Sequence, residues 1–259
     1  LGQDDITDFL CLTLSSPDYA GHNYGPDAVE MEDMFLRLDK ELGELLAYLD
    51  KNIGKNEYTI FLTADHGAAH NADYMKQLKI PAGSETQAEA GDKLNEYLKE
   101  KTGKDSMVLA LYNYQVYLNE SLIEKADADR EELKNHITKW LQQQAGVAFV
   151  VDMEEMDDAV VPEPIRTMII NGYNSERSGC MQIVMKPGWY SGHSKTGTTH
   201  GSWNPYDTHI PLLWFGNGIK SGQTYRTVNM TDIAPTLAAL LHIQMPNGCT
   251  GNVITELLD

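Results

Sequence analysis

The stretch "YTIFLTADHG", residues 58–67, joins a short apolar run directly to an aspartate and a histidine. The run is typical of a buried strand, because it is rich in aromatic and β-branched residues and ends in a turn signal. Asp65 and His66 fall where the strand ends, and Gly67 lets the backbone turn sharply behind them. Ligands of α/β proteins gather at the carboxyl ends of strands, so the stretch predicts a sheet with a polar site at its edge.

The residues upstream have a similar arrangement. The run "DFLCLTL" (8–14) predicts a second buried strand, and residues 27–51 predict a long amphipathic helix. Strand, helix and strand in this order form the unit of a parallel α/β sheet. Asp18 and His22, in "SSPDYAGHNYG", follow the first strand. This segment is too rich in Ser, Pro and Gly for an ordinary helix interior, so the pair is either a surface helical turn or part of a metal site.

The pattern of polar and apolar residues changes in the middle third of the chain. Residues 83–180 predict polar helices and short strands, typical of an α+β insertion or cap, and the α/β pattern resumes over 181–259. Residues 1–82 and 181–259 are therefore expected to form one sheet around the insertion. The expected fold class is α/β, a three-layer sandwich with a mainly parallel sheet.

Charge and composition exclude several classes of protein. The 259 residues carry a formal net charge of -18, which repels phosphate backbones, so we expect no nucleic-acid-binding module. No apolar run approaches the roughly 18 residues that a membrane span needs. The three cysteines, Cys11, Cys180 and Cys249, show no spacing of a disulfide framework or a thiolate zinc site.

A third histidine lies in another glycine- and threonine-rich loop. "GTTHGSWN", residues 197–204, places His200 immediately before a predicted strand, and His209 competes with it for the same role. Aspartate oxygen together with histidine nitrogen suits zinc, with manganese or iron as substitutes, and disfavours calcium. His70 fits a surface or supporting position better, and His193 and His242 lack acidic neighbours.

Several of these segments carry a resemblance to a known family. "SSPDYAGHNYG", "LTADHGAAH" and "GTTHGSWNPYDTHIPLLWFGNGI", followed by "VNMTDIAPTLAALLHIQMPNGCTG", resemble the metal-site loops and C-terminal part of the alkaline phosphatase superfamily. The resemblance is to its phosphodiesterase/nucleotide pyrophosphatase-like branch, and within that to the periplasmic phosphate-irrepressible alkaline phosphatases. It covers roughly residues 1–80 and 180–259, and is weaker between them.

The resemblance implies a site with two zinc ions, for which manganese could substitute. One zinc takes Asp18, His22 and His200, and the other takes Asp65 and His66. In the family, a further aspartate and a threonine or serine nucleophile complete the ligands of the second zinc. No matching loop is recognisable in this chain, so we expect both upstream, together with the N-terminal part of the fold.

The expected activity follows from the same resemblance. It is zinc-dependent hydrolysis of small-molecule phosphate monoesters through a covalent phospho-enzyme, by a periplasmic or secreted protein. A phosphodiesterase or nucleotide pyrophosphatase, or a catalytically incomplete metal-binding fragment, is the alternative. We expect this chain by itself to be inactive, and its oligomeric state stays open.

Overall fold

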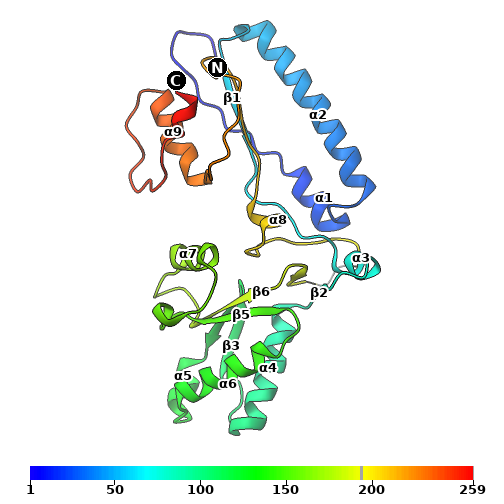
Figure 1. Cartoon of the computed structure of the whole chain (residues 1–259), viewed down its shortest axis with the longest axis vertical. Coiled ribbons are helices and arrows are strands. Elements are labelled where there is room, and N and C mark those ends of the chain that lie inside the picture. The colour runs from blue at the N-terminus through cyan, green and yellow to red at the C-terminus, as the bar shows by residue number, and fades with distance from the viewer. Residues whose placement is uncertain (193–194, 259) are drawn as a thin grey trace. The chain divides into compact units, whose positions relative to one another are not determined.

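A computed structural model describes residues 1–192 and 195–258 (Figure 1). The chain divides into two compact units, which we describe one at a time. The first comprises Leu1–Leu14, Leu36–Ala64 and the residues from Pro211 onward, and the second comprises Ser15–Phe35 and Asp65–Ile210. His193, considered above, lies outside the described residues.

The first unit contains the strand that precedes the Asp65–His66 pair. β1 (Thr59–Thr63) pairs antiparallel with β8 (Leu212–Gly216), and the rings of Phe61 and Trp214 face each other across the pair at 5.1 Å between centroids. Aromatic pairs of this kind stabilise neighbouring strands. Both strands were predicted, and both are confirmed as strands; their antiparallel pairing departs from the expected parallel sheet.

The helices that precede β1 and follow β8 along the chain lie at the predicted positions. α2 (Val29–Leu49) runs on into a short π-helical turn, Asp50–Gly54, and confirms the helix expected over 27–51. α9 (Ile233–Leu240) follows a 3-10 turn, Met230–Asp232, and a second such turn, Thr255–Leu257, lies near the end of the chain. Within the described residues, no helix is long and apolar enough to cross a membrane.

The buried carboxylate of Asp232 organises the start of α9. It accepts hydrogen bonds from the backbone N–H groups of Asn229 at 2.9 Å and Asn252 at 2.8 Å. The side chain is almost completely buried, with 3% of the residue exposed. The carboxylate thus closes the 3-10 turn that leads into α9 and also holds a distant loop, while α9 itself has no side-chain cap at its start.

The strand expected over residues 8–14 is not formed. These residues form no regular structure and pair with no strand among the described ranges, and their apolar side chains are exposed, with Phe9 at 54% and Leu12 at 62%. An apolar run becomes a strand only where a neighbour accepts its backbone hydrogen bonds. The prediction was wrong for the chain as described because no such neighbour is present in this part of it.

The second unit is built around a four-stranded antiparallel sheet in the order β3–β4–β6–β5. Its strands are β3 (Val108–Tyr112), β4 (Gln115–Leu118), β5 (Val147–Asp152) and β6 (Met181–Met185). We expected β6 to resume the sheet of the outer segments, but it pairs with β4 and β5. The sheet of the middle segment thus extends past residue 180, and among the described strands only β8 pairs with β1 of residues 1–82.

The parallel arrangement expected from the sequence is limited. Among the described residues, the one parallel pair joins β2 (Gly83–Ser84) to β7 (Trp189–Tyr190). The chain has the expected mixture of helices and strands of an α/β protein, but its strands form small sheets.

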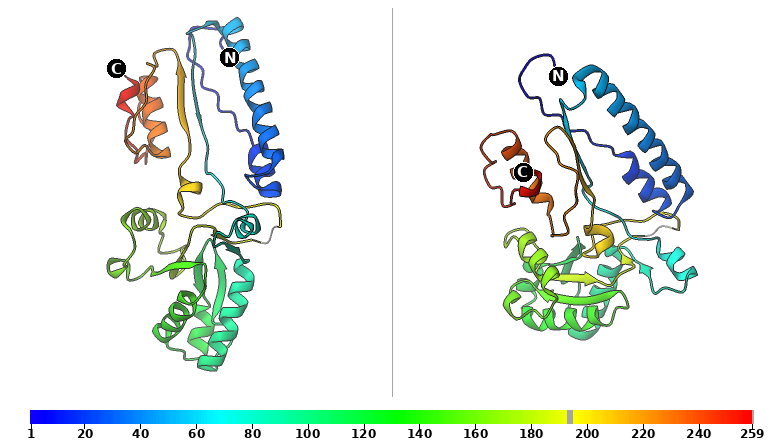
Figure 2. Two further views of the ribbon diagram at one scale, coloured as in Figure 1. Left: turned by 45° about the vertical axis from the view of Figure 1, so that its right-hand side comes forward. Right: turned by 45° about the horizontal axis from the view of Figure 1, so that its top comes forward.

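Helices cover both faces of the four-stranded sheet, as the two views in Figure 2 show. α4 (Gln87–Thr102) and α6 (Arg130–Gln142) pack on one face, and α7 (Glu163–Gly172) packs on the other. The remaining short helices of this unit are α1 (Ser16–Tyr24), α3 (Ala72–Gln77), α5 (Glu120–Lys125), α8 (Pro205–Thr208) and a 3-10 turn, Met156–Asp158. The sequence did not predict α7 or β5.

Local signals set the ends of the two long helices. Thr86 and Glu89 form a reciprocal capping box at the start of α4, and Gly103 ends that helix in the left-handed conformation, with φ of 72°. Asp129 caps α6 by accepting from two backbone N–H groups of its first turn. These groups would otherwise lack partners, so the caps define where each helix begins and ends.

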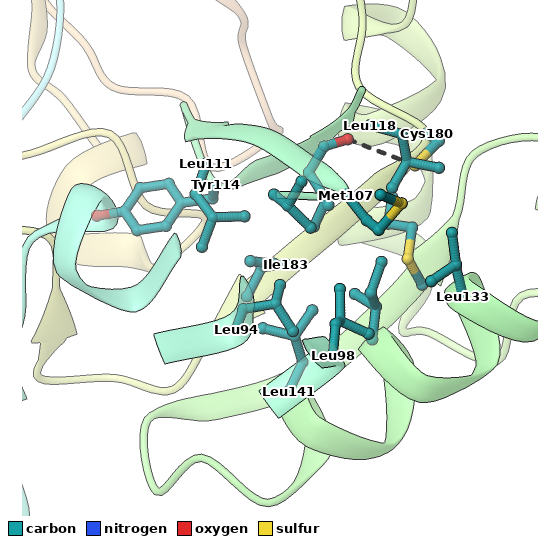
Figure 3. Close-up of a cluster of buried hydrophobic side chains, with 14 of the residues drawn as sticks. Leu94, Leu98, Met107, Leu111, Tyr114, Leu118, Leu133, Leu141, Cys180 and Ile183 are labelled. Carbon is teal, nitrogen blue, oxygen red and sulfur yellow. Dashed lines mark hydrogen bonds between the residues drawn. The ribbon is translucent and has the colours of Figure 1, made fainter. Parts of the chain in front are cut away.

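The main core of the second unit lies between the helices and the sheet. Figure 3 shows leucines of α4 and α6 directed toward the strands, among them Leu94, Leu98 and Leu133, which are at most 1% exposed. They meet Leu111 of β3 and Ile183 of β6 in one continuous cluster. Burial of these side chains is the main term that holds this part of the chain together.

A network of charged groups joins α6 to the segment after β5. Lys134 is buried and contacts Asp152 Oδ2 at 2.6 Å and Glu154 Oε2 at 3.1 Å. Arg130 donates to both carboxylate oxygens of Glu154, at 2.6 and 2.7 Å. These hydrogen bonds, first from Arg130 and then from Lys134, lower the pKa of Glu154 to about 2.

We expect this network to make the second unit sensitive to acid. A carboxyl group whose pKa is lower in the folded protein contributes stability above its unfolded value, 4.5, and this stability is lost as the pH falls toward about 2. Glu154→Gln should therefore lower the melting temperature at pH 7 and weaken its dependence on pH between 5 and 3. Thermal unfolding followed by circular dichroism measures both, with Glu155→Gln as the neighbouring exposed control. Equal pH dependence in wild type and Glu154→Gln would contradict the role of the network.

Candidate metal centre

Asp18 and His22 lie on one short helix. Pro17 stands in the first turn of α1, where its missing N–H has no helical partner to lose, and Gly25 ends the helix with φ of 83°. The spacing of four residues puts both side chains on one face, with His22 Nε2 at 3.3 Å from Asp18 Oδ1. The segment is therefore a helical turn, and its pair faces other polar groups.

His66 joins this pair from the loop after β1. Its Nε2 lies 4.0 Å from Asp18 Oδ1 and 3.6 Å from Asp65 Oδ2. The two adjacent residues differ in exposure, since the side chain of Asp65 is 84% exposed and that of His66 is 25% exposed. Asp65 is thus at the rim, and His66 points inward toward the helix.

His200 completes the cluster from the third loop. Its ring stacks on that of His66 with centroids 3.4 Å apart and planes 12° apart, and it lies 5.2 Å from the ring of His22. One ligand atom from each of Asp18, His66 and His200 lies within 4.8 Å of the others, which is a group able to hold a metal ion. All five side chains predicted from the sequence therefore gather in one region of the second unit.

Two of the histidines are oriented by backbone carbonyls. His22 Nδ1 lies 3.0 Å from the carbonyl oxygen of Thr198, and His66 Nδ1 lies 2.8 Å from that of Gly67. A carbonyl can only accept, so Nδ1 of each ring carries the proton and Nε2 of the neutral ring holds a lone pair. Both lone pairs then face the carboxylate of Asp18, which favours a cation between them.

The charge state of His200 agrees with this arrangement. Burial lowers the pKa of His200 below its usual value, and the neighbouring rings of His66 and His22 lower it further, against opposing effects of Asp18 and Asp207. A neutral imidazole is the form that binds a metal. The donor set of neutral imidazoles and carboxylates therefore fits zinc or a similar transition metal.

The other candidate histidines lie outside the cluster. His209 is exposed, and none of the described ring or ligand-atom contacts of the cluster includes it. His70 donates from Nδ1 to Asp27 Oδ2 at 2.8 Å, at the surface. His242 is exposed in the first unit.

Sequence reasoning missed one polar residue beside the cluster. Asp207 is 4% exposed, and its carboxylate accepts a hydrogen bond from the backbone N–H of Ser202 at 2.6 Å. It stands in "NPYDTH" without a neighbour of opposite charge, so the sequence offers no signal that distinguishes it from a surface turn.

Comparison with known proteins finds matches that cover most or all of this chain. The family model "Type I phosphodiesterase / nucleotide pyrophosphatase" matches residues 2–208. The alkaline phosphatase PafA of Elizabethkingia meningoseptica is 44% identical over all of this chain and 47% of its own length. A crystal structure of PafA superposes with a TM-score of 0.93, covering 100% of this chain and 49% of that one.

Two further relatives have similar coverage. The alkaline phosphatase PhoV of Synechococcus elongatus is 44% identical over 100% of this chain and 46% of its own length. A Myroides odoratus protein named as a calcium-transporting ATPase is 49% identical over 98% of this chain and 46% of its own length. The chain therefore spans about half the length of the curated relatives it matches.

Proposed function

Because the chain belongs to the type I phosphodiesterase / nucleotide pyrophosphatase family, we propose that its protein is a zinc-dependent phosphoric-ester hydrolase that prefers monoesters. Two of the relatives that match the whole chain are named alkaline phosphatases, which supports the monoester preference. The same resemblance supports a periplasmic or secreted location.

One observation carries the proposal. His22 and His66 each present a lone pair toward the carboxylate of Asp18, with Nε2 at 3.3 and 4.0 Å from its Oδ1. Imidazole nitrogens that converge on a carboxylate in this way form a donor set that would hold a divalent cation. His200, stacked on His66, adds a further nitrogen to the same group.

We assign the side chains to two zinc ions, following the family resemblance. Asp18, His22 and His200 would hold the first, and Asp65 and His66 would contribute to the second. When bound, such ions act as Lewis acids on a phosphoryl group and its leaving oxygen. The adjacency of the two sets supports a shared site, since His66 lies within 4.0 Å of Asp18.

The chain's own residues have defined tasks in this scheme. The carboxylates of Asp18 and Asp65 supply negative charge that offsets the cations, and the backbone carbonyls of Thr198 and Gly67 hold two imidazoles in the tautomer that binds metal. The hydroxyl of Thr198 already donates to the carbonyl of Ala69 at 2.6 Å, which makes it a poor nucleophile. A threonine or serine outside this chain is the proposed nucleophile, and it would form a covalent phospho-enzyme.

The family description itself supports a second candidate function. Hydrolysis of phosphodiesters or nucleotide pyrophosphates, the reactions named in the description of the matching family, would use the same donor set. A catalytically incomplete metal-binding segment is the remaining alternative.

A comparison of two aryl substrates tests the proposal. The full-length protein is expected to hydrolyse an aryl phosphate faster than a bis-aryl phosphate, to lose activity after dialysis against a chelator, and to recover it with zinc. Faster cleavage of the diester would favour the second candidate. Activity that survives removal of metal would refute metal dependence. If neither ester is hydrolysed with zinc present, the hydrolase proposal fails and the remaining alternative, a metal-binding segment, is favoured.

A further inference from the structure

The loop that carries His200 is bonded to both of the other loops of the candidate metal centre. Within residues 197–208, the carbonyl of Thr198 accepts from His22 Nδ1 at 3.0 Å. At the other end of the loop, the carbonyl of Asp207 accepts from the backbone N–H of Gly67 at 2.8 Å. The loop 197–208 thus links the helix of His22 to the turn that follows β1.

The turn after β1 and the end of this loop are in direct backbone contact. A Cβ atom placed on Gly67 would lie 2.0 Å from the carbonyl oxygen of Tyr206, so no side chain fits between the two segments. Any movement of residues 206–207 is therefore transmitted to His66, the direct neighbour of Gly67.

The side chain of Asp207 closes the loop on itself. Its Oδ2 accepts from the backbone N–H of Ser202, which lies two residues after His200. Its Oδ1 is buried, and no donor to it exists among the residues that the structure describes. Burial of a carboxylate with one oxygen unpaired costs free energy, so the fold retains this group at a cost. A hydrogen bond that holds the His200 loop in place accounts for its retention.

We propose that Asp207 is a positioning residue for the candidate metal centre. Its side chain holds Ser202 while its main chain holds Gly67, so one residue sets the distance between the segments of His200 and His66. This inference rests on the proposed metal centre, but it concerns a residue that binds no metal itself. It predicts that the hydrogen bond to Ser202, rather than the negative charge, is what the site requires.

Zinc affinity of the full-length protein tests this proposal. Dissociation constants for zinc are measured by competition with a chromophoric chelator for wild type, Asp207→Ala, Asp207→Asn and Asp207→Leu. Asp207→Ala is expected to bind zinc about 10- to 100-fold more weakly, as is usual when a group that orients metal ligands is removed. Asp207→Asn keeps an oxygen that can accept from Ser202 and should retain most of the affinity. Asp207→Leu keeps a branched side chain without an acceptor and should show the same loss of zinc affinity, so it serves as the second test if the alanine variant does not fold.

The matched control is Asp232→Ala, in the other unit. Asp232 is equally buried and also accepts backbone hydrogen bonds, so its loss should lower the melting temperature without changing the zinc dissociation constant. Wild-type affinity in Asp207→Ala or Asp207→Leu would overturn the proposal, as would an Asp207→Asn variant as weak as alanine. If the wild type binds zinc and His22→Ala does not, these outcomes refute only the role of Asp207. If the wild type binds no zinc, the metal centre fails and this inference fails with it.

Discussion

Replacing His200 by alanine in the full-length protein is expected to lower kcat/KM for an aryl phosphate on the order of a thousandfold. The ring of His200 lies 3.4 Å from that of His66 and 5.2 Å from that of His22, so its removal opens the centre of the cluster. Three protein groups are the usual minimum of a catalytic zinc site, and this variant would leave the first proposed ion with two. The bound zinc, measured by elemental analysis, should fall together with the activity.

His209→Ala is the control for this experiment. The two histidines lie in the same glycine- and threonine-rich part of the sequence, but His209 is exposed and makes none of the ring contacts of the cluster. Its replacement should leave zinc content and kcat/KM close to wild type. The opposite pattern, with loss in His209→Ala and none in His200→Ala, would show that the third ligand had been assigned to the wrong residue.

The candidate site was predictable because its residues are marked by local sequence. A strand followed directly by Asp65 and His66, and a second aspartate and histidine four residues apart, are patterns that can be read without knowing the fold. The rule that ligands gather at strand ends predicted the convergence of these loops, although only β1 of the two strands invoked before Asp18 and Asp65 is formed. The helix over residues 16–24 was harder to predict, because Pro17 and the glycines argue against a helix. Proline is nevertheless well tolerated in the first turn of a helix, where Pro17 lies.

The features that sequence reasoning missed depend on distant contacts. Residues 8–14 have the composition of a strand, but such a run becomes a strand only if it pairs with a neighbour. Its own sequence does not determine whether it finds one. β6 looks like the other apolar runs, and its place beside β4 and β5 follows from the packing of the whole second unit. Asp207 is the clearest case, because its burial and its hydrogen bond to Ser202 arise only once the loop has folded.

Leu98→Ala is expected to cost roughly 2–5 kcal/mol of the free energy of unfolding of the second unit. Leu98 is 0% exposed and lies in the cluster between α4, α6 and the sheet, so its truncation removes buried contacts and leaves a cavity that rigid neighbours fill poorly. Urea unfolding followed by far-ultraviolet circular dichroism measures the change.

Leu109→Ala is the matched control for this loss of stability. Leu109 lies on β3 of the same unit but is 69% exposed, so the same truncation should change the free energy of unfolding by no more than about 0.5 kcal/mol. A loss as small in Leu98→Ala would mean that the cluster shown in Figure 3 does not stabilise this unit. Because Leu98 belongs to no loop of the metal centre, its variant should also keep the zinc dissociation constant of wild type in the absence of urea, which separates the stability of the sheet from the assembly of the site.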